Sequence, residues 1–107
     1  MKTIAIPVYG NRISNRLDCS TNVLLVLVEN GRISEHATYH WASVKPLEKI
    51  EMLLDLGVDV LICDGITAFD ANQLRSKPIQ VIPWIRGEVD KVLKKYLEGQ
   101  FTTDMLI

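Results

Sequence analysis

Apolar runs alternate with polar, glycine-marked turns along this chain. Five of the runs have the length and composition of β-strands, and they lie at residues 3–8, 23–28, 33–39, 58–63 and 79–82. Three other segments carry apolar residues at the spacing of a helix with one buried face, and these lie at residues 43–57, 67–74 and 87–99. The pattern therefore predicts the element order βββαβαβα.

Short local signals place the ends of several elements. Asn30-Gly31 is a strong hairpin signal between the second and third strands. Ser43 is a candidate N-cap of the first helix, and Thr67 is placed to cap the second. Pro7 cannot donate a hydrogen bond to a ladder, so pairing of the first strand should end near it.

A hairpin meander followed by two parallel crossovers assembles naturally into one mixed sheet. The expected fold is α/β, with five strands in the order 3-2-1-4-5 and helices on both faces, as in three-layer ribonuclease H-like folds. The first strand would lie centrally, beside the second and the fourth. The order of strands reverses direction between the first and fourth strands, and this position is called a topological switch point. Open α/β sheets bind ligands there, which is the edge where the first and fourth strands end.

Composition narrows the classes of protein that this chain can belong to. The 107 residues carry a net charge of -1, with no basic stripe for nucleic acid. No apolar run approaches the ~20 residues that span a bilayer, and the opening Met1-Lys2-Thr3-Ile4 lacks a signal pattern. We therefore expect one cytoplasmic domain with reduced thiols and with neither nucleic acid nor membrane as a partner.

Residues with metal-ligand chemistry converge on the predicted switch-point edge. Cys63 ends the fourth strand, Cys19 lies in the polar loop of residues 9–21, and His40 ends the third strand. Two thiolates and an imidazole suit zinc, copper(I) or an iron–sulfur type cluster. The helix after Gly65 would point its N-terminus at the same place, lowering the pKa of Cys63 or holding an anionic cluster. Each residue also has a plainer interpretation, as a buried hydrophobe for Cys63 and as a loop or edge-strand residue for the others.

Other side chains near this edge carry weaker signals. Arg16 and Arg12 could meet an anion at the site, although loop arginines usually face solvent. Asp64 could bind a hard metal or could equally be a turn residue before glycine. Trp41 and Trp84 are interpreted as packing residues.

Several segments in a fixed order carry a family resemblance. They are Ile4-Ala5-Ile6-Pro7-Val8, Leu25-Val26-Leu27-Val28-Glu29-Asn30-Gly31-Arg32-Ile33, Leu56-Gly57-Val58-Asp59-Val60-Leu61-Ile62-Cys63-Asp64-Gly65-Ile66 and Tyr96-Leu97-Glu98-Gly99. Together they resemble the dinitrogenase iron–molybdenum cofactor-binding family, which includes NifX-like proteins, NafY and the end of NifB. The resemblance implies a ribonuclease H-like domain over residues 1–99, followed by a tail at 100–107, and a role in binding or carrying metal clusters or their precursors.

The chain departs from the family pattern at three places. The loop after the third strand is usually longer and richer in His and Gly, and here it is the short His40-Trp41-Ala42-Ser43. Many members carry a His-Phe-Gly-Arg type sequence in the first loop, where this chain has Arg16-Leu17-Asp18-Cys19-Ser20. The usual Gly-Gly after the fourth strand is Asp64-Gly65 here. A cysteine in the first loop would replace the usual ligand.

The leading hypothesis is a small, non-catalytic carrier or chaperone of a metal–sulfur cluster of the iron–molybdenum type. Its candidate metal ligands are Cys19, Cys63 and His40, and its candidate cofactor-binding residues are the two cysteines with Arg16, Asp64 and Gly65. The expected partners are cluster donor and acceptor proteins, and a second copy of the chain is a further candidate.

Two alternatives stay open. The first is a metal-free interaction or regulatory module, whose cue is the apolar end of the tail. The second, weaker alternative is a thiol redox enzyme that uses Cys63, although the chain has no Cys-x-x-Cys pair.

Overall fold

The computed structural model describes residues 1–101. The elements, in chain order, are β1 (Lys2–Tyr9), β2 (Arg12–Ile13), β3 (Asn22–Glu29), β4 (Arg32–His40), α1 (Pro46–Asp55), β5 (Val60–Ile62), α2 (Ala68–Arg75), β6 (Gln80–Ile82) and α3 (Val89–Leu97). The predicted α/β class and the three predicted helices are confirmed.

The strands form one mixed sheet in the order β4-β3-β1-β5-β6, which is the predicted order. β1, β3 and β4 pair antiparallel, whereas β5 lies parallel to both β1 and β6. The predicted count of five strands is wrong, because the chain turns back after Tyr9 and β2 pairs with the end of β1. The ribonuclease H-like label stays a prediction.

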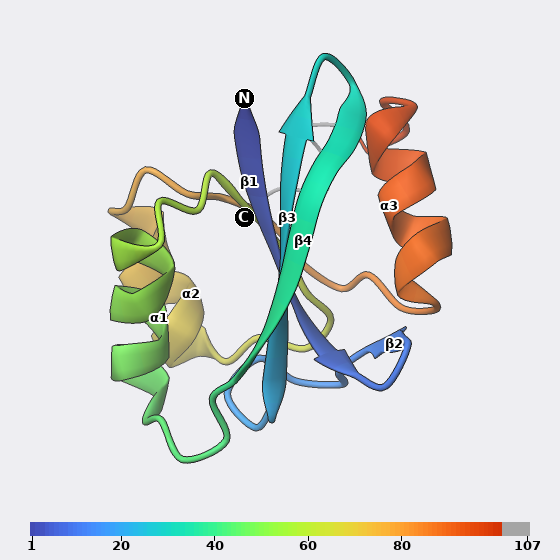
Figure 1. Cartoon of the computed structure of the whole chain (residues 1–107). Coiled ribbons are helices and arrows are strands. Elements are labelled where there is room, and N and C mark those ends of the chain that lie inside the picture. Colours follow the sequence, from blue (N-terminus) through green and yellow to red (C-terminus); the bar gives the residue numbers. More distant parts are fainter. Residues whose placement is uncertain (102–107) are drawn as a thin grey trace.

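Helices cover both faces of the sheet and create two separate hydrophobic cores (Figure 1). α1 and α2 lie on one face and α3 lies on the other. Successive residues of a strand point to opposite faces, so Ile4 and Ile6 of β1 enter the core under α3, whereas Ala5 enters the core under α1 and α2. β1 is therefore the buried centre of the molecule.

Two predicted element ends are wrong. β1 continues past Pro7 to Tyr9, because β3 pairs with it as far as Val8 and β2 pairs with Val8 and Tyr9. The parallel pairing with β5 involves only Ile4 and Ala5, so it does not reach Pro7. The N-cap of α1 is Lys45 rather than Ser43, since Pro46 takes the first helical position.

The other two helices begin as predicted. Thr67 caps α2, with its hydroxyl oxygen accepting a hydrogen bond from the Asp70 N–H at 3.1 Å. α3 buries Val89, Val92 and Leu93 against the sheet, as its spacing predicts.

The predicted tail lies mostly outside the described residues, which end at Phe101. The ring of Phe101 packs near that of Tyr96, with centroids 6.4 Å apart, against the core under α3. Within residues 1–101, no helix has the length and apolar character needed to cross a bilayer.

Candidate functional site

A hollow of about 440 Å³ opens at the edge where β1 and β5 end. Three segments wall it: residues 12–16, the pair Asp64-Gly65 after β5, and residues 84–87 after β6. This edge is the predicted switch point, since β1 and β5 are parallel neighbours and the chain continues from β1 to β3 on one flank of this pair and from β5 to β6 on the other. We call this hollow the arginine hollow, because Arg12, Arg16 and Arg86 all line it.

The floor of the arginine hollow is fixed by backbone pairing around Gly65. Its N–H donates to the Asn15 carbonyl at 2.8 Å, and its carbonyl accepts from the Leu17 N–H at 2.9 Å. A Cβ at Gly65 would lie 2.7 Å from the Asn15 oxygen, so only glycine allows this approach. Gly65 thus holds the first loop in place, and its N–H is used within the fold rather than offered to a ligand.

A buried polar group holds the rest of the first loop. The Lys49 ammonium is fully buried and donates to the carbonyls of Asp18 at 3.0 Å and Ser20 at 2.8 Å. Its charge lies 5.1 Å from the ring centroid of Trp41, whose indole N–H donates to the Ser20 hydroxyl at 3.0 Å. Burial lowers the pKa of Lys49. These contacts clamp the carbonyls on both sides of Cys19 and leave its thiol outside.

Cys19 is exposed and lies beside the arginines. It lines a second hollow, of about 450 Å³, together with Tyr9, Arg12 and Arg16. This hollow adjoins the arginine hollow, because the two share Arg12, Ile13, Asn15 and Arg16. The loop therefore presents a thiol and guanidinium groups to the same solvent-open region.

Two of the arginines are oriented by carboxylates. Arg16 bonds Asp18 through two nitrogens, at 3.0 and 2.6 Å, and this hydrogen bonding raises the pKa of Arg16. Arg86 contacts the buried Asp64 at 3.3 Å, with the Arg86 side chain 81% exposed. The guanidinium of Arg86 is thus tethered at one end and open to solvent elsewhere.

Cys63 lies in a different environment from the one that we expected. It is completely buried in the core under α1 and α2, and burial raises the pKa of its thiol to about 12. The expected lowering of its pKa is wrong, because loss of water opposes the thiolate. Such a thiol is poorly suited to nucleophilic chemistry, which weakens the thiol redox alternative.

The three predicted metal ligands are not gathered into one cluster. Within residues 1–101 no group of three or more His, Cys, Asp or Glu side chains is placed to hold a metal ion. His40 is exposed and its Nδ1 lies 3.1 Å from the Asn22 side-chain oxygen. Direct ligation by Cys63 or His40 stays a prediction.

Asp70 is a second buried ionisable residue near the first loop. Its carboxylate is 1% exposed, and neither oxygen has a hydrogen-bond partner. Burial, with a smaller contribution from Asp18, raises the pKa of Asp70. Folding therefore makes this carboxyl group harder to ionise than an exposed aspartate.

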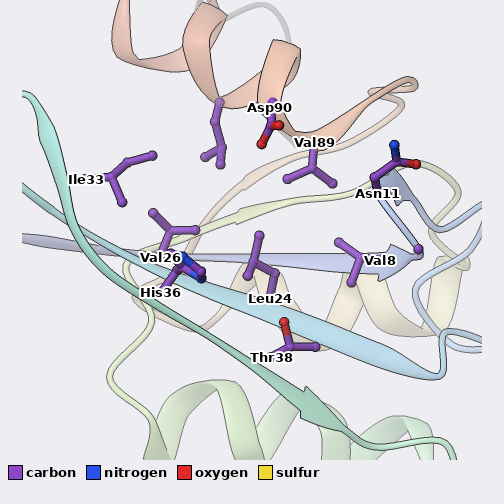
Figure 2. Close-up of a pocket in the computed structure, with 11 residues that line it drawn as sticks. Val8, Asn11, Leu24, Val26, Ile33, His36, Thr38, Val89 and Asp90 are labelled. Carbon is purple, nitrogen blue, oxygen red and sulfur yellow. The ribbon is translucent and has the colours of Figure 1, made fainter.

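Another hollow, of about 290 Å³, lies between α3 and the sheet (Figure 2). Figure 2 shows Val8, Leu24 and Val26 of the sheet facing Val89 and Asp90 of α3 across this space. Its lining is mainly apolar and includes neither a cysteine nor an arginine. It therefore offers less to an anionic or thiophilic ligand than the arginine hollow does.

The arginine hollow includes two residues that the sequence does not predict for it. They are Arg86 and Trp84, and Trp84, which the sequence predicts to be a packing residue, is 62% exposed. The interpretation of Trp41 as a packing residue is confirmed, since it is fully buried. A useful signal was the position of Trp84 and Arg86 directly after β6, whose carboxyl end lies at the same edge as that of β5.

Comparison with known proteins gives the class to which this fold and site belong. The family model described as "Dinitrogenase iron-molybdenum cofactor" matches residues 1–99, so the chain belongs to this family. The description of the family relates it to the iron–molybdenum cofactor of dinitrogenase, which is consistent with a cofactor-related binding role.

Three solved structures illustrate the shared fold. A provisionally assigned dinitrogenase from Methanocaldococcus jannaschii is 20% identical, with a TM-score of 0.79 over 98% of this chain and 93% of the other. A provisionally assigned NifB protein from Thermotoga is 21% identical, with a TM-score of 0.71 over 97% and 99%. The apo form of the orange protein from Desulfovibrio gigas is 18% identical, with a TM-score of 0.74 over 100% and 97%. No curated protein sequence matches the chain.

Proposed function

We propose that this protein carries an anionic metal–sulfur cluster or cofactor precursor, which it binds at the arginine hollow and the adjoining Cys19 loop. The observation that carries the proposal is an exposed thiol beside the arginine hollow: Cys19 lines a hollow with Arg12 and Arg16, and both of these arginines also line the arginine hollow. The family to which the chain belongs supports the choice of cargo.

Charge supports an anionic cargo. Metal–sulfur clusters carry net negative charge, and guanidinium groups give charge-assisted hydrogen bonds to such anions. Arg12 and Arg16 line the hollow from the first loop and Arg86 lines it from the segment after β6, so a bound anion could contact more than one of them. Asp18 and Asp64 would orient two of these arginines toward the cargo.

Ligand chemistry supports a metal–sulfur cargo in particular. A thiolate is a soft ligand that suits iron–sulfur and copper(I) centres, and Cys19 is the exposed one of the two cysteines. The proposal gives Cys19 the role of a direct ligand, Arg16 and Asp64 roles in the cofactor pocket, and Gly65 the role of holding the loop against β5. An open site with few protein ligands suits a carrier, because the cargo must also be released.

Anaerobic loading tests the proposal. The protein is incubated with ferrous iron and sulfide, or with tetrathiomolybdate, and bound metal is measured after gel filtration. We expect the wild type to retain metal, Cys19→Ser to lose most of it, and an Arg16→Gln, Arg86→Gln double variant to bind about tenfold more weakly. Arg75→Gln, an exposed arginine of α2 outside the hollow, is the matched control and should bind as the wild type does. Equal loading of all four proteins would contradict the proposal.

A further inference from the structure

Trp84 has a backbone conformation that is unusual for a large side chain. Its φ is 64°, in the left-handed region, and its neighbours Pro83 and Ile85 are both buried. The Trp84 N–H donates to the Asp64 carbonyl at 3.1 Å, and the Ile85 N–H donates to the Cys63 carbonyl at 3.0 Å. This turn continues the pairing of the two strands beyond the ends of β5 and β6, and it leaves the Trp84 side chain exposed to solvent.

The fold gains little from having tryptophan at this position. A left-handed conformation costs a residue with a Cβ roughly 1–2 kcal/mol, whereas glycine adopts it freely. The side chain is also 62% exposed, so it recovers little of its cost through burial. Its hydrogen bond to the Asp64 carbonyl uses the backbone N–H, which glycine would supply equally well. Strained residues of this kind gather at sites of function.

Trp84, whose side chain is exposed, is one of the residues that line the arginine hollow. It lines the hollow together with Arg12, Arg16 and Arg86. We propose that Trp84 is the residue by which the hollow selects large, weakly hydrated sulfide anions over small, strongly hydrated oxyanions. This inference rests on the proposed function and adds a selectivity to it.

The physical basis is the exclusion of water. A flat apolar ring beside a bound anion removes water from one side of it, which strengthens the arginine contacts in the lower local dielectric. Sulfide-rich anions lose little hydration when they meet such a surface, whereas oxyanions lose much more. The indole N–H also offers one donor to a sulfide.

Tetrathiomolybdate and molybdate form a matched pair of probes, because they share the metal, the charge and the tetrahedral shape. Binding of each is measured by anaerobic equilibrium dialysis with molybdenum analysis. The proteins are the wild type, Trp84→Gly, Trp84→Phe and Phe69→Ala, in which an exposed aromatic residue of α2 outside the hollow is removed. Thermal unfolding of each variant is recorded in parallel.

We expect the wild type to bind tetrathiomolybdate at least tenfold more tightly than molybdate. Trp84→Gly should lose most of this preference while unfolding at the same temperature as the wild type or higher, and Trp84→Phe and Phe69→Ala should keep the preference. If Trp84→Gly keeps the preference, or if it unfolds well below the wild type, the inference is overturned while the carrier function stands. If the wild type binds neither anion nor a reconstituted cluster, the proposed function fails and the inference fails with it.

Discussion

Replacing Lys49 by methionine tests whether a buried ammonium holds the Cys19 loop. Methionine keeps an unbranched apolar stem against Trp41 but removes the charge and both hydrogen bonds to the carbonyls of Asp18 and Ser20. Lys49 is 2% exposed, and its hydrogen bond to the Ser20 carbonyl is buried. Water would therefore not readily replace the lost donor at that carbonyl. The loop should therefore loosen on the side that carries Cys19.

The magnitude follows from the contacts that are lost. Two hydrogen bonds from a charged donor contribute about 1.5–3 kcal/mol each, and the ring contact contributes roughly 0.5–1 kcal/mol. Methionine recovers part of this, because burying an ammonium itself costs several kcal/mol. We expect a net loss of about 2–4 kcal/mol in the free energy of unfolding, and a fall of about 10–20 °C in Tm.

Urea unfolding followed by circular dichroism measures the loss. Lys91→Met is the matched control, since Lys91 is 76% exposed on α3 and makes only a long contact of 4.0 Å with Glu88. It should change the free energy of unfolding by less than about 0.5 kcal/mol. The reasoning would be refuted if Lys49→Met were as stable as the wild type, because dehydration of the ammonium would then outweigh its bonds.

Three further predictions test other parts of the structure. Gly65→Ala should destabilise the protein by about 1–3 kcal/mol in urea unfolding, since a Cβ would lie 2.7 Å from the Asn15 oxygen; unchanged stability would contradict the close approach. Burial raises the pKa of Asp70 above 3.8, so its contribution to stability is greatest below that pH and is lost as pH rises through the raised pKa. Asp70→Asn should therefore be more stable than the wild type at pH 7, by about 1–2 kcal/mol, with a gap that narrows toward pH 4; a gap that does not change with pH would contradict this. A thiol reagent at neutral pH should modify Cys19 quickly and Cys63 only on unfolding, because Cys63 is buried with a pKa of about 12; two fast thiols would show that the core opens.

The sheet order could be predicted because few topologies suit a hairpin followed by two crossovers. Asn30-Gly31 forms the turn of the β3–β4 hairpin, and right-handed crossovers place β5 beside β1. β2 could not be predicted, since a strand of two residues has no periodicity to detect. The order alone was enough to bring the first loop and the end of β5 to one edge.

The candidate site was predicted less completely, because position along a strand does not fix the direction of a side chain. Leu61 and Cys63 share a face that packs under α1 and α2, while Val60 and Ile62 face α3. The alternation of strand residues favours the interpretation of Cys63 as a buried hydrophobe, whereas its position at the strand end alone also allowed a metal ligand. The outward turn of Trp84 could not be predicted, since nothing in its local sequence requires a positive φ.

Elemental analysis of untagged protein purified without oxygen, combined with its visible absorption spectrum, tests the central claim most directly. The account predicts iron or molybdenum in simple proportion to the protein, with a sulfur-to-metal charge-transfer band that Cys19→Ser removes. Colourless, metal-free protein that also fails to take up a supplied cluster would contradict a carrier function at the arginine hollow.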